Sequence, residues 1–306
     1  APNTSTDRTI TLPDATATLA TKENFLSTGI DDNASAVKLT VSDSGINVNG
    51  AVTSLAIKEV DAGNVGIGVT PSSWPSNGDF RALQVGSGLS LYGRGSGDKD
   101  RVGMTANAYV DVTNDRFEYI GTGHATHYSQ SDGTHYFQTA ASGSADGAIT
   151  FTNVMSIDPT GAVTKPLQPA FYVNAASLSG NLSVGTDTTV VFNNERFDVN
   201  ADYNNSNYTF TAPVTGKYHF DLQVLLDDWD SSANYYYLQL ITSNRTHYEL
   251  RSGEVNPGDP DYTYMQVHAL ADMDAGDTAY VNLNQNAGAS ETGYDSQSFW
   301  SGYLAC

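Results

Sequence analysis

The sequence is poor in cysteine and in long apolar runs. Its single cysteine, Cys306, is the last of 306 residues, so no disulfide can form within one chain and stability must come from burial and assembly. No apolar run approaches the roughly 20 residues of a membrane helix, and no charged-then-apolar signal segment opens the chain. We therefore expect no membrane insertion. Because the chain begins with Ala1 rather than Met, we expect that a segment precedes it.

Basic residues are scarce. The chain has 14 Lys and Arg against 34 Asp and Glu, which gives a net charge of −20. Such a surface repels nucleic acid and anionic membranes, so we expect neither as a partner. Partners should instead be neutral, cationic or bridged by a divalent metal, although the acidity also serves solubility or growth in saline surroundings.

Sequence motifs of enzymes are missing as well. The sequence has no Gly-x-Ser-x-Gly nucleophile elbow, no paired cysteines for a metal and no phosphate-binding loop. A glycan-cleaving protein would need two facing carboxylates, and nothing among the 34 acidic residues singles out such a pair. We therefore expect that the protein is not an enzyme, with glycan cleavage kept as an alternative.

Helical periodicity is nearly absent, and residues 15–26 are the one candidate for a short helix. Elsewhere, short runs of Val, Ile, Thr, Tyr and Phe are separated by Gly, Asn, Asp and Ser, which is typical of strands and tight turns. Pro166 and Pro169 would interrupt any strand ladder and mark a boundary. The sequence thus predicts an all-β protein with two domains, residues 1–165 and 166–306.

In the first domain, Asp and Gly lie between apolar residues in three short segments, 41–48, 60–68 and 157–163. Asp can bond its own backbone and Gly can adopt a positive φ, so each segment is predicted to hold a hairpin turn. Strands this short bury too little apolar surface in one chain to offset an ordering cost of roughly 1–2 kcal/mol per residue. We therefore expect three chains to share an axis in a trimeric, β-rich fibre shaft.

In the second domain, residues 216–224 alternate between apolar and polar side chains. This is the period of a strand with one face in a core and the other in water, and it predicts that Tyr218, Phe220, Leu222 and Val224 point inward. Residues 210–216, which contain a proline and end in glycine, are predicted to reverse the chain before that strand.

The aromatic and glycine residues of this domain follow a spaced pattern. Phe192 is followed by Asp198, Tyr203, Phe210 and the segment 216–220, and the chain closes with Phe-Trp-Ser-Gly-Tyr-Leu at 299–304. This order resembles the globular head of the complement C1q-like family, with Leu222 where the family usually has an aromatic residue. The resemblance implies a ten-stranded C1q/TNF-like jelly roll that assembles as a homotrimer. The residues that carry this trimer and core signature are Phe192, Tyr203, Phe210, Gly216, Tyr218, Phe220, Gly302 and Tyr303.

A second resemblance concerns the first domain. Residues 63–71, Gly-Asn-Val-Gly-Ile-Gly-Val-Thr-Pro, resemble a segment that recurs in fibrous proteins of tailed bacteriophages, and residues 107–158 are similar to the module that often follows it. Residues 9–16 also resemble entries to such fibres. The head of the complement family normally follows a collagen stalk, but no Gly-x-y repeat exists in this sequence. The β modules would take its place.

Together these resemblances imply a structural virion fibre protein of a tailed phage, located on the outside of the particle. Its trimeric head would bind a bacterial surface glycan or protein, and the segment before Ala1 would bind other virion proteins. One alternative is a purely structural decoration or collar fibre, with the head as a trimerisation clamp. Others are a glycan-degrading tail spike and a secreted bacterial lectin-like protein.

Two acidic segments of the second domain are candidates for ligand binding. The first contains Asp227, Asp228 and Asp230, and the second contains Asp259 and Asp261. Carboxylates in flexible turns are ligands that calcium prefers, so calcium is the candidate cofactor at either segment, with Asp227, Asp228 and Asp230 as its ligands at the first. A third acidic segment, 272–277, has a structural explanation, because it resembles the turn into a late strand of the head.

Aromatic residues beside these carboxylates are the other candidates. Trp229 lies between aspartates, where we expect it to be exposed, and Tyr262 and Tyr264 follow Asp261. Flat amphipathic rings of this kind stack on sugars or anchor protein surfaces. The sequence therefore predicts a receptor site at Asp227, Asp228, Trp229, Asp230, Asp259, Asp261, Tyr262 and Tyr264. His124, His127 and His135 could hold a transition metal on a three-fold axis or be ordinary strand residues.

Overall fold

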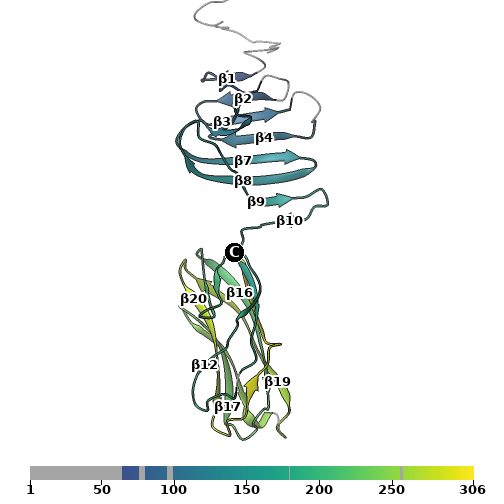
Figure 1. The fold of residues 1–306 in the computed structure, drawn as a ribbon, viewed down its shortest axis with the longest axis vertical. Helices are drawn as coiled ribbons and strands as arrows, with labels where there is room; N and C mark the ends of the chain where they lie inside the picture. Colours follow the sequence, from purple (N-terminus) through teal and green to yellow (C-terminus); the bar gives the residue numbers. More distant parts are fainter. Residues whose placement is uncertain (1–63, 76–79, 95–98, 179, 256–257) are drawn as a thin grey trace, which may run out of the picture. The chain divides into compact units, whose positions relative to one another are not determined.

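The computed structural model describes residues 64–75, 80–94, 99–178, 180–255 and 258–306. The chain divides into two compact units, residues 1–57 and 58–306, and the first unit lies outside the described residues. Three predictions therefore lie outside them as well: the fibre-like entry at 9–16, the helix at 15–26 and the hairpin turn at 41–48. Figure 1 shows the ribbon with its strand labels.

The all-β prediction is confirmed for the described residues, which contain strands and one short 3-10 turn, η2, but no α-helix. The strands of residues 64–164 are β1 (Val65–Ile67), β2 (Arg81–Val85), β3 (Leu89–Gly93), β4 (Val102–Ala106), β5 (Ala108–Asp111), β6 (Arg116–Tyr119), β7 (Gly123–Ser131), β8 (Thr134–Gly143), β9 (Thr152–Ile157) and β10 (Val163–Thr164). Those that follow are β11 (Ala170–Asn174), β12 (Thr188–Thr189), β13 (Asn194–Asp198), β14 (Tyr203–Asn204), β15 (Thr209–Thr211), β16 (Gly216–Asp227), β17 (Tyr235–Thr242), β18 (Thr246–Ser252), β19 (Tyr262–Met273), β20 (Thr278–Asn286), β21 (Gly293–Tyr294) and β22 (Phe299–Leu304), with η2 at Gly253–Val255.

Eight of the first ten strands form one sheet in the order β1-β2-β3-β4-β7-β8-β9-β10. The hairpin predicted at 157–163 is confirmed, because β9 pairs antiparallel with β10 and the Asp158 carboxylate accepts a bond from the Thr160 N–H at 2.8 Å. The turn residues of the hairpin predicted at 60–68 lie outside the described residues, and the described part of this segment holds β1, which pairs in parallel with β2. A parallel pair needs a longer connection than a tight turn.

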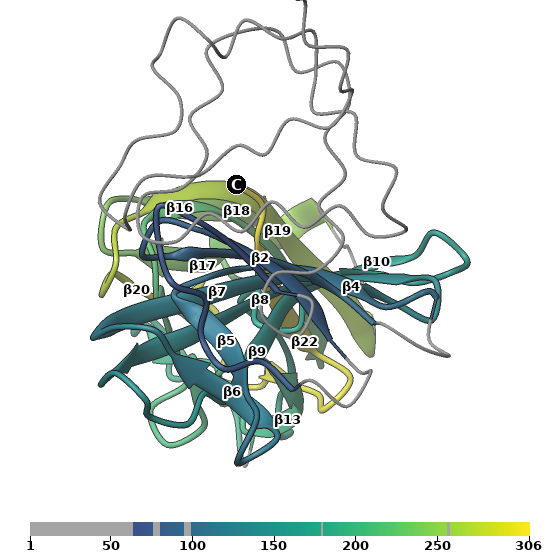
Figure 2. The ribbon, with the colours of Figure 1, turned by 90° about the horizontal axis from the view of Figure 1, so that it is seen from above.

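A separate hairpin, β5–β6, lies against one face of this sheet (Figure 2). Its Tyr109 and Val110 are buried in a cluster with Trp74 and Phe80, and Tyr119 of β6 is buried with Ala125 of β7 in a second cluster. The hairpin therefore removes the apolar side chains on that face from water, and one side of the sheet acquires a core.

The strands from β11 onward form two sheets. One has the order β13-β11-β22-β16-β19, with the short strand β21 beside β16. The other has the order β14-β15-β20-β17-β18, with the short strand β12 beside β20. Neighbours in each sheet are far apart in sequence, so the chain passes repeatedly between the sheets, as in a jelly roll. Each sheet has five strands on its main path and one extra two-residue strand, against the ten predicted in all.

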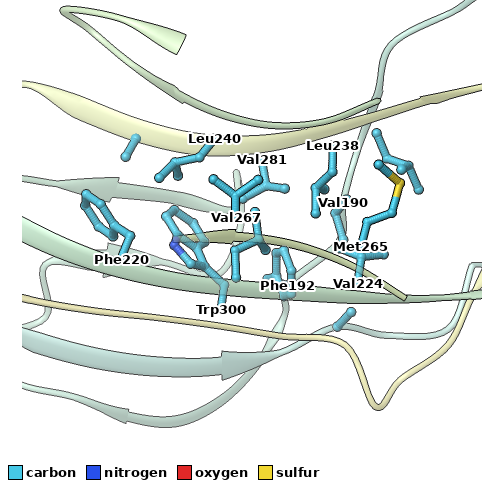
Figure 3. Packing of buried hydrophobic residues seen from close by; sticks show 14 of the residues in the cluster. Val190, Phe192, Phe220, Val224, Leu238, Leu240, Met265, Val267, Val281 and Trp300 are labelled. Atoms are coloured by element: carbon cyan, nitrogen blue, oxygen red, sulfur yellow. The ribbon is translucent and has the colours of Figure 1, made fainter. Parts of the chain in front are cut away.

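The core of this sandwich lies between the two sheets. The prediction for β16 is confirmed, because Tyr218, Phe220, Leu222 and Val224 are fully buried. Figure 3 shows Phe220 and Trp300 of one sheet facing Leu238 and Leu240 of the other. The alternation of β16 thus places every second side chain in a shared core.

The chain reverses at residues 210–216, as predicted, because the Phe210 ring lies 5.4 Å from that of Tyr218 and 5.7 Å from that of Phe220. The reversal joins two sheets rather than neighbouring strands of one, since β15 and β16 belong to different sheets. Gly216 is not among the described glycines with positive φ, so the turn-conformation argument for it is wrong. A Cβ at Gly216 would lie 2.6 Å from Leu304 Cδ1 and 2.7 Å from the Cys306 carbonyl oxygen. Glycine is needed there because the end of the chain packs directly on the backbone.

Candidate functional site

The fold brings the two predicted acidic segments together at one end of the sandwich. Asp227 ends β16 and is the register partner of Tyr262, which begins β19. Just beyond, the Asp228 N–H donates to the Asp261 carbonyl at 3.0 Å, and the Trp229 N–H donates to the Pro260 carbonyl at 3.2 Å. The Ser231 N–H donates to Asp259 Oδ1 at 2.7 Å. Residues that the sequence separates by about thirty positions thus form one surface.

The exposed side chains of this surface are those that a partner could contact. Tyr262 is 64% exposed and Tyr264 is 50% exposed, as the sequence predicts. Three aspartates of the two segments are exposed beside them. We call this set the acidic corner, and it consists of Asp228, Asp259, Asp261, Tyr262 and Tyr264.

The prediction that Trp229 is exposed is wrong. Its side chain is fully buried, its ring centroid lies 4.0 Å from that of Tyr236, and its Nε1–H donates to the Gly253 carbonyl at 2.9 Å. A ring held in this way cannot stack on a sugar. Trp229 instead fixes the loop that follows β16, so its role here is structural.

Asp230 is also buried, and its carboxylate is used within the chain. It accepts hydrogen bonds from the backbone N–H groups of Ser232 and Ala289, and from Gln285 Nε2 at 3.3 Å. Burial acts to raise the pKa of Asp230, but the bonds from Ser232 and Ala289 outweigh it and leave this pKa below its ordinary value. The predicted contact of Asp230 with a receptor or a metal is therefore not available.

We expect Asp230→Asn to destabilise the protein at pH 7 by about 1.5–3 kcal/mol, the usual value of hydrogen bonds to a charged group. The asparagine must present an N–H to donors that now face a carboxylate oxygen. Because the folded pKa is lowered, this stabilisation is present above the ordinary aspartate pKa and is lost as the pH falls through the folded value. The free energies of unfolding of the wild type and of Asp230→Asn are measured in urea at pH 7 and at pH 2.5. If the variant is less stable than the wild type by the same amount at both pH values, the stabilising role of the Asp230 carboxylate is contradicted.

The calcium prediction finds no support in the geometry. Asp227 is partly buried at the end of β16, Asp228 is exposed, and Asp230 turns inward, so the three carboxylates do not converge. Burial raises the pKa of Asp227, and the nearby charge of Asp228 raises it further. Among the described residues, no group of three or more His, Cys, Asp or Glu side chains could hold a metal ion.

The remaining polar groups have structural roles. Asp277 Oδ2 accepts the Asp274 N–H at 2.8 Å, which forms the turn into β20, as the sequence predicts for segment 272–277. His127 is buried, with its ring 5.1 Å from that of Phe117, and burial lowers its pKa. His124 lies on the same strand but is exposed. In the part of the chain that the structure describes, these histidines do not form a group that could hold a metal.

The signature aromatics lie in the core of the sandwich, with one exception. Phe192, Tyr203, Phe210, Tyr218 and Phe220 are buried in a single cluster. The hydroxyl of Tyr203 donates to the Phe192 carbonyl at 2.7 Å, which joins two of the spaced positions.

The exception is Tyr303, which is 48% exposed, with its ring 5.3 Å from that of His219 on the outer face of the sheet. Tyr303 lies outside the core of the single chain, because β22 alternates and its neighbours Trp300 and Gly302 take the inward positions. Its predicted part in a trimer stays a prediction. A Cβ at Gly302 would lie 2.5 Å from Phe220 Cδ1.

Sequence reasoning missed exposed residues on β18. Tyr248 and Leu250 are exposed there, on the strand that follows β17. Glu249 Oε2 accepts the Gln266 N–H of β19 at 2.6 Å, so the edge strands of the two sheets lie side by side close to the acidic corner. The sequence offers no signal for this exposure, because the alternation of Tyr248 and Leu250 with polar neighbours would place the two apolar side chains in a core.

Residues 170–304 thus form a jelly-roll sandwich of two antiparallel sheets with an acidic, aromatic surface at one end. Their sequence matches the protein family described as the C1q domain over residues 170–305. This part of the chain is therefore a C1q domain. Domains of the C1q/TNF type typically form homotrimers, often mediate binding and are typically extracellular.

Two solved structures to which the chain is similar each match 45% of it. One is the globular domain of zebrafish complement 1qA protein, with 18% identity and a TM-score of 0.32 over 45% of this chain and 98% of that one. Another is murine APRIL, with 12% identity and a TM-score of 0.33 over the same shares. No curated protein matches the chain. Among the described residues, no helix is long and apolar enough to cross a membrane.

Proposed function

We propose that the chain is the subunit of a homotrimeric, non-enzymatic virion fibre of a tailed phage, and that its C1q domain binds a molecule on the bacterial surface. The observation that carries receptor binding is the acidic corner, where two exposed tyrosines lie beside three exposed aspartates on a C1q domain. The resemblance of residues 63–71 to fibrous phage proteins supports the virion context.

The chemistry of the corner favours a neutral or cationic partner. Tyr262 and Tyr264 offer flat apolar rings with a hydroxyl, which suit stacking on a sugar ring or contact with an apolar protein patch. Asp228, Asp259 and Asp261 accept hydrogen bonds from sugar hydroxyls or from basic side chains, and they repel anionic polymers. Three copies of a weak site on one particle would gain affinity by avidity.

We expect Tyr262→Ala combined with Tyr264→Ala to weaken binding to host bacteria about 30-fold or more, because exposed aromatic anchors carry much of the energy of an interface. The measurement is the binding of labelled full-length protein to a panel of bacterial strains and to a glycan array. Phe197→Ala is the matched control, since Phe197 is also 50% exposed but lies on β13, the opposite edge strand of the same sheet. An unchanged affinity in the double variant would contradict the assignment.

Trimerisation has its own measurement. Light scattering of the native protein should give a mass of about 98 kDa, three times the 32.6 kDa of one chain. A stable, folded monomer would defeat the proposed assembly. A double tyrosine variant that loses the trimer, rather than only its affinity, would place the two rings at a contact between subunits.

The alternatives make different predictions for the same protein. A trimerisation clamp in a decoration or collar fibre predicts no binding to cells by the wild-type protein. A glycan-degrading tail spike predicts release of oligosaccharides from host polysaccharide, with no loss of this activity in the double tyrosine variant. A secreted bacterial lectin-like protein predicts glycan binding without association with phage particles.

A further inference from the structure

The eight-stranded sheet of residues 65–164 carries apolar side chains on both faces, although the hairpin β5–β6 covers only one of them. On the side covered by the hairpin β5–β6, the side chains of Gln84, Ser90 and Thr105 are buried. On the uncovered side, Leu91 is 40% exposed and Met104 is 46% exposed. A sheet with one wet face normally keeps its apolar side chains on the dry face, so the part of the chain that the structure describes leaves a core-like surface in water.

The strand register lines up the exposed apolar side chains into a continuous row. Leu91 of β3 is paired with Leu83 of β2 and with Met104 of β4, and Met104 is paired with Tyr128 of β7. The row continues in both directions without a charged residue. We call it the central row, and it consists of Val65, Leu83, Leu91, Met104, Tyr128, Phe137 and Met155.

The two rows that flank it share the same face and are also nearly uncharged. One flanking row contains Ile67, Val85, Leu89, Ala106, Thr126 and Thr139, and the other contains Arg81, Gly93, Val102, Gln130, His135, Ile157 and Val163. Among these described residues Arg81 is the one with a fixed charge, and none is Asp or Glu. In a chain with a net charge of −20, this face is where identical copies can meet without opposing carboxylates.

The face is also hollowed in a way that suits other side chains. A groove of about 670 Å³ runs along Leu83, Leu91, Val102 and Met104. A second groove of about 320 Å³ lies beside Met104, where Leu89 and Phe137 line it. Apolar side chains from the same face of another copy can insert into grooves of this size.

We propose that the central row packs against the central rows of two other copies around a shared axis, which gives residues 65–157 an assembly surface of their own. That three copies meet at this axis rests on the homotrimer proposed above. The occupant is a second and third copy, because identical faces turned toward one axis form a closed assembly and bury the apolar rows together. The contact does not involve the C1q domain, so it adds to any trimer contact made there.

Cysteine scanning of the central row tests this proposal in the full chain. Leu91→Cys, Met104→Cys and Tyr128→Cys are each made with Cys306→Ser, which removes the exposed natural thiol. The control is Thr113→Cys with Cys306→Ser, because Thr113 is exposed in the turn of the hairpin that covers the opposite face. Each protein is labelled in its native state with a maleimide–polyethylene glycol reagent and, separately, oxidised with copper phenanthroline.

We expect the central-row thiols to react with maleimide about tenfold or more slowly than the thiol at position 113, since labelling requires the face to open. We also expect that oxidation links chains by a disulfide in at least one of the three variants, seen as a covalent dimer on a non-reducing gel, and not in the control. Protected thiols that form no such link would mean that another part of the chain or another protein covers the face, and the proposal would be overturned.

Light scattering of the same variants separates this inference from the proposed function. A trimer whose central-row thiols label as fast as the control overturns the assembly surface and leaves the homotrimer intact. A monomer overturns both. If one cysteine variant fails to fold, the neighbouring positions of the row give the same readout, because the register places them side by side.

Discussion

Replacing Trp300 with alanine should destabilise the C1q domain by about 3–5 kcal/mol, the cost of removing a fully buried tryptophan. Trp300 is the point where the core aromatics meet. Its ring lies 4.9 Å from that of Phe171, 5.6 Å from that of Tyr203 and 6.0 Å from that of Phe220. Because a domain has only about 5–15 kcal/mol in all, we expect the melting temperature of the domain to fall by ~10 °C or more.

The measurement is thermal and urea unfolding followed by near-ultraviolet circular dichroism. Trp300→Phe is the matched control, and it should lose much less, because Trp300 Nε1 has no hydrogen-bond partner in the described chain and a smaller ring keeps most of the packing. Equal losses in the two variants would show that something other than cavity formation dominates at this site.

Trp229→Ala should be nearly as damaging, about 3 kcal/mol or more, although this residue lies in an acidic loop. The change removes a buried ring that packs on Tyr236, and it leaves the Gly253 carbonyl without its donor. An exposed binding tryptophan would give the opposite result, with stability unchanged and affinity lost. Urea unfolding measured together with binding to bacteria therefore decides between the two roles.

The variant Trp229→Phe separates the contribution of ring packing from that of the hydrogen bond to Gly253. Phenylalanine keeps part of the stacking on Tyr236 but cannot donate to Gly253, so we expect a loss of about 1–3 kcal/mol from the unpaired carbonyl. A phenylalanine variant as stable as the wild type would show that the hydrogen bond from Trp229 to Gly253 does not stabilise the domain. Affinity per folded molecule should stay unchanged in both variants.

Much of the jelly roll could be predicted from local patterns. The alternation along residues 216–224 depends only on the period of a strand, and it correctly placed four side chains in the core. The spacing of Phe192, Tyr203 and Phe210 resembles that of the C1q-like family, and the family match over residues 170–305 agrees with it. The structure adds that these three side chains meet in one cluster.

The candidate site was predicted less well, because burial in loops depends on distant residues. Trp229 is surrounded by aspartates in the sequence, yet its partner Gly253 is 24 residues away. Asp230 is bound by Ala289, which is 59 residues away. Tyr262 and Tyr264 were placed correctly, since their exposure follows from alternation on an edge strand.

The sequence by itself determined that the described chain is built from strands, which residues alternate along them, and where the aromatic core of the C1q domain lies. Tertiary structure alone decided that the segments around Asp228 and Asp261 meet, and that Trp229 is buried against Tyr236 and bonded to Gly253. It also decided which face of the eight-stranded sheet the hairpin β5–β6 covers. Alternation shows that a strand has two faces, but which face is covered depends on register and on packing between residues far apart in the chain.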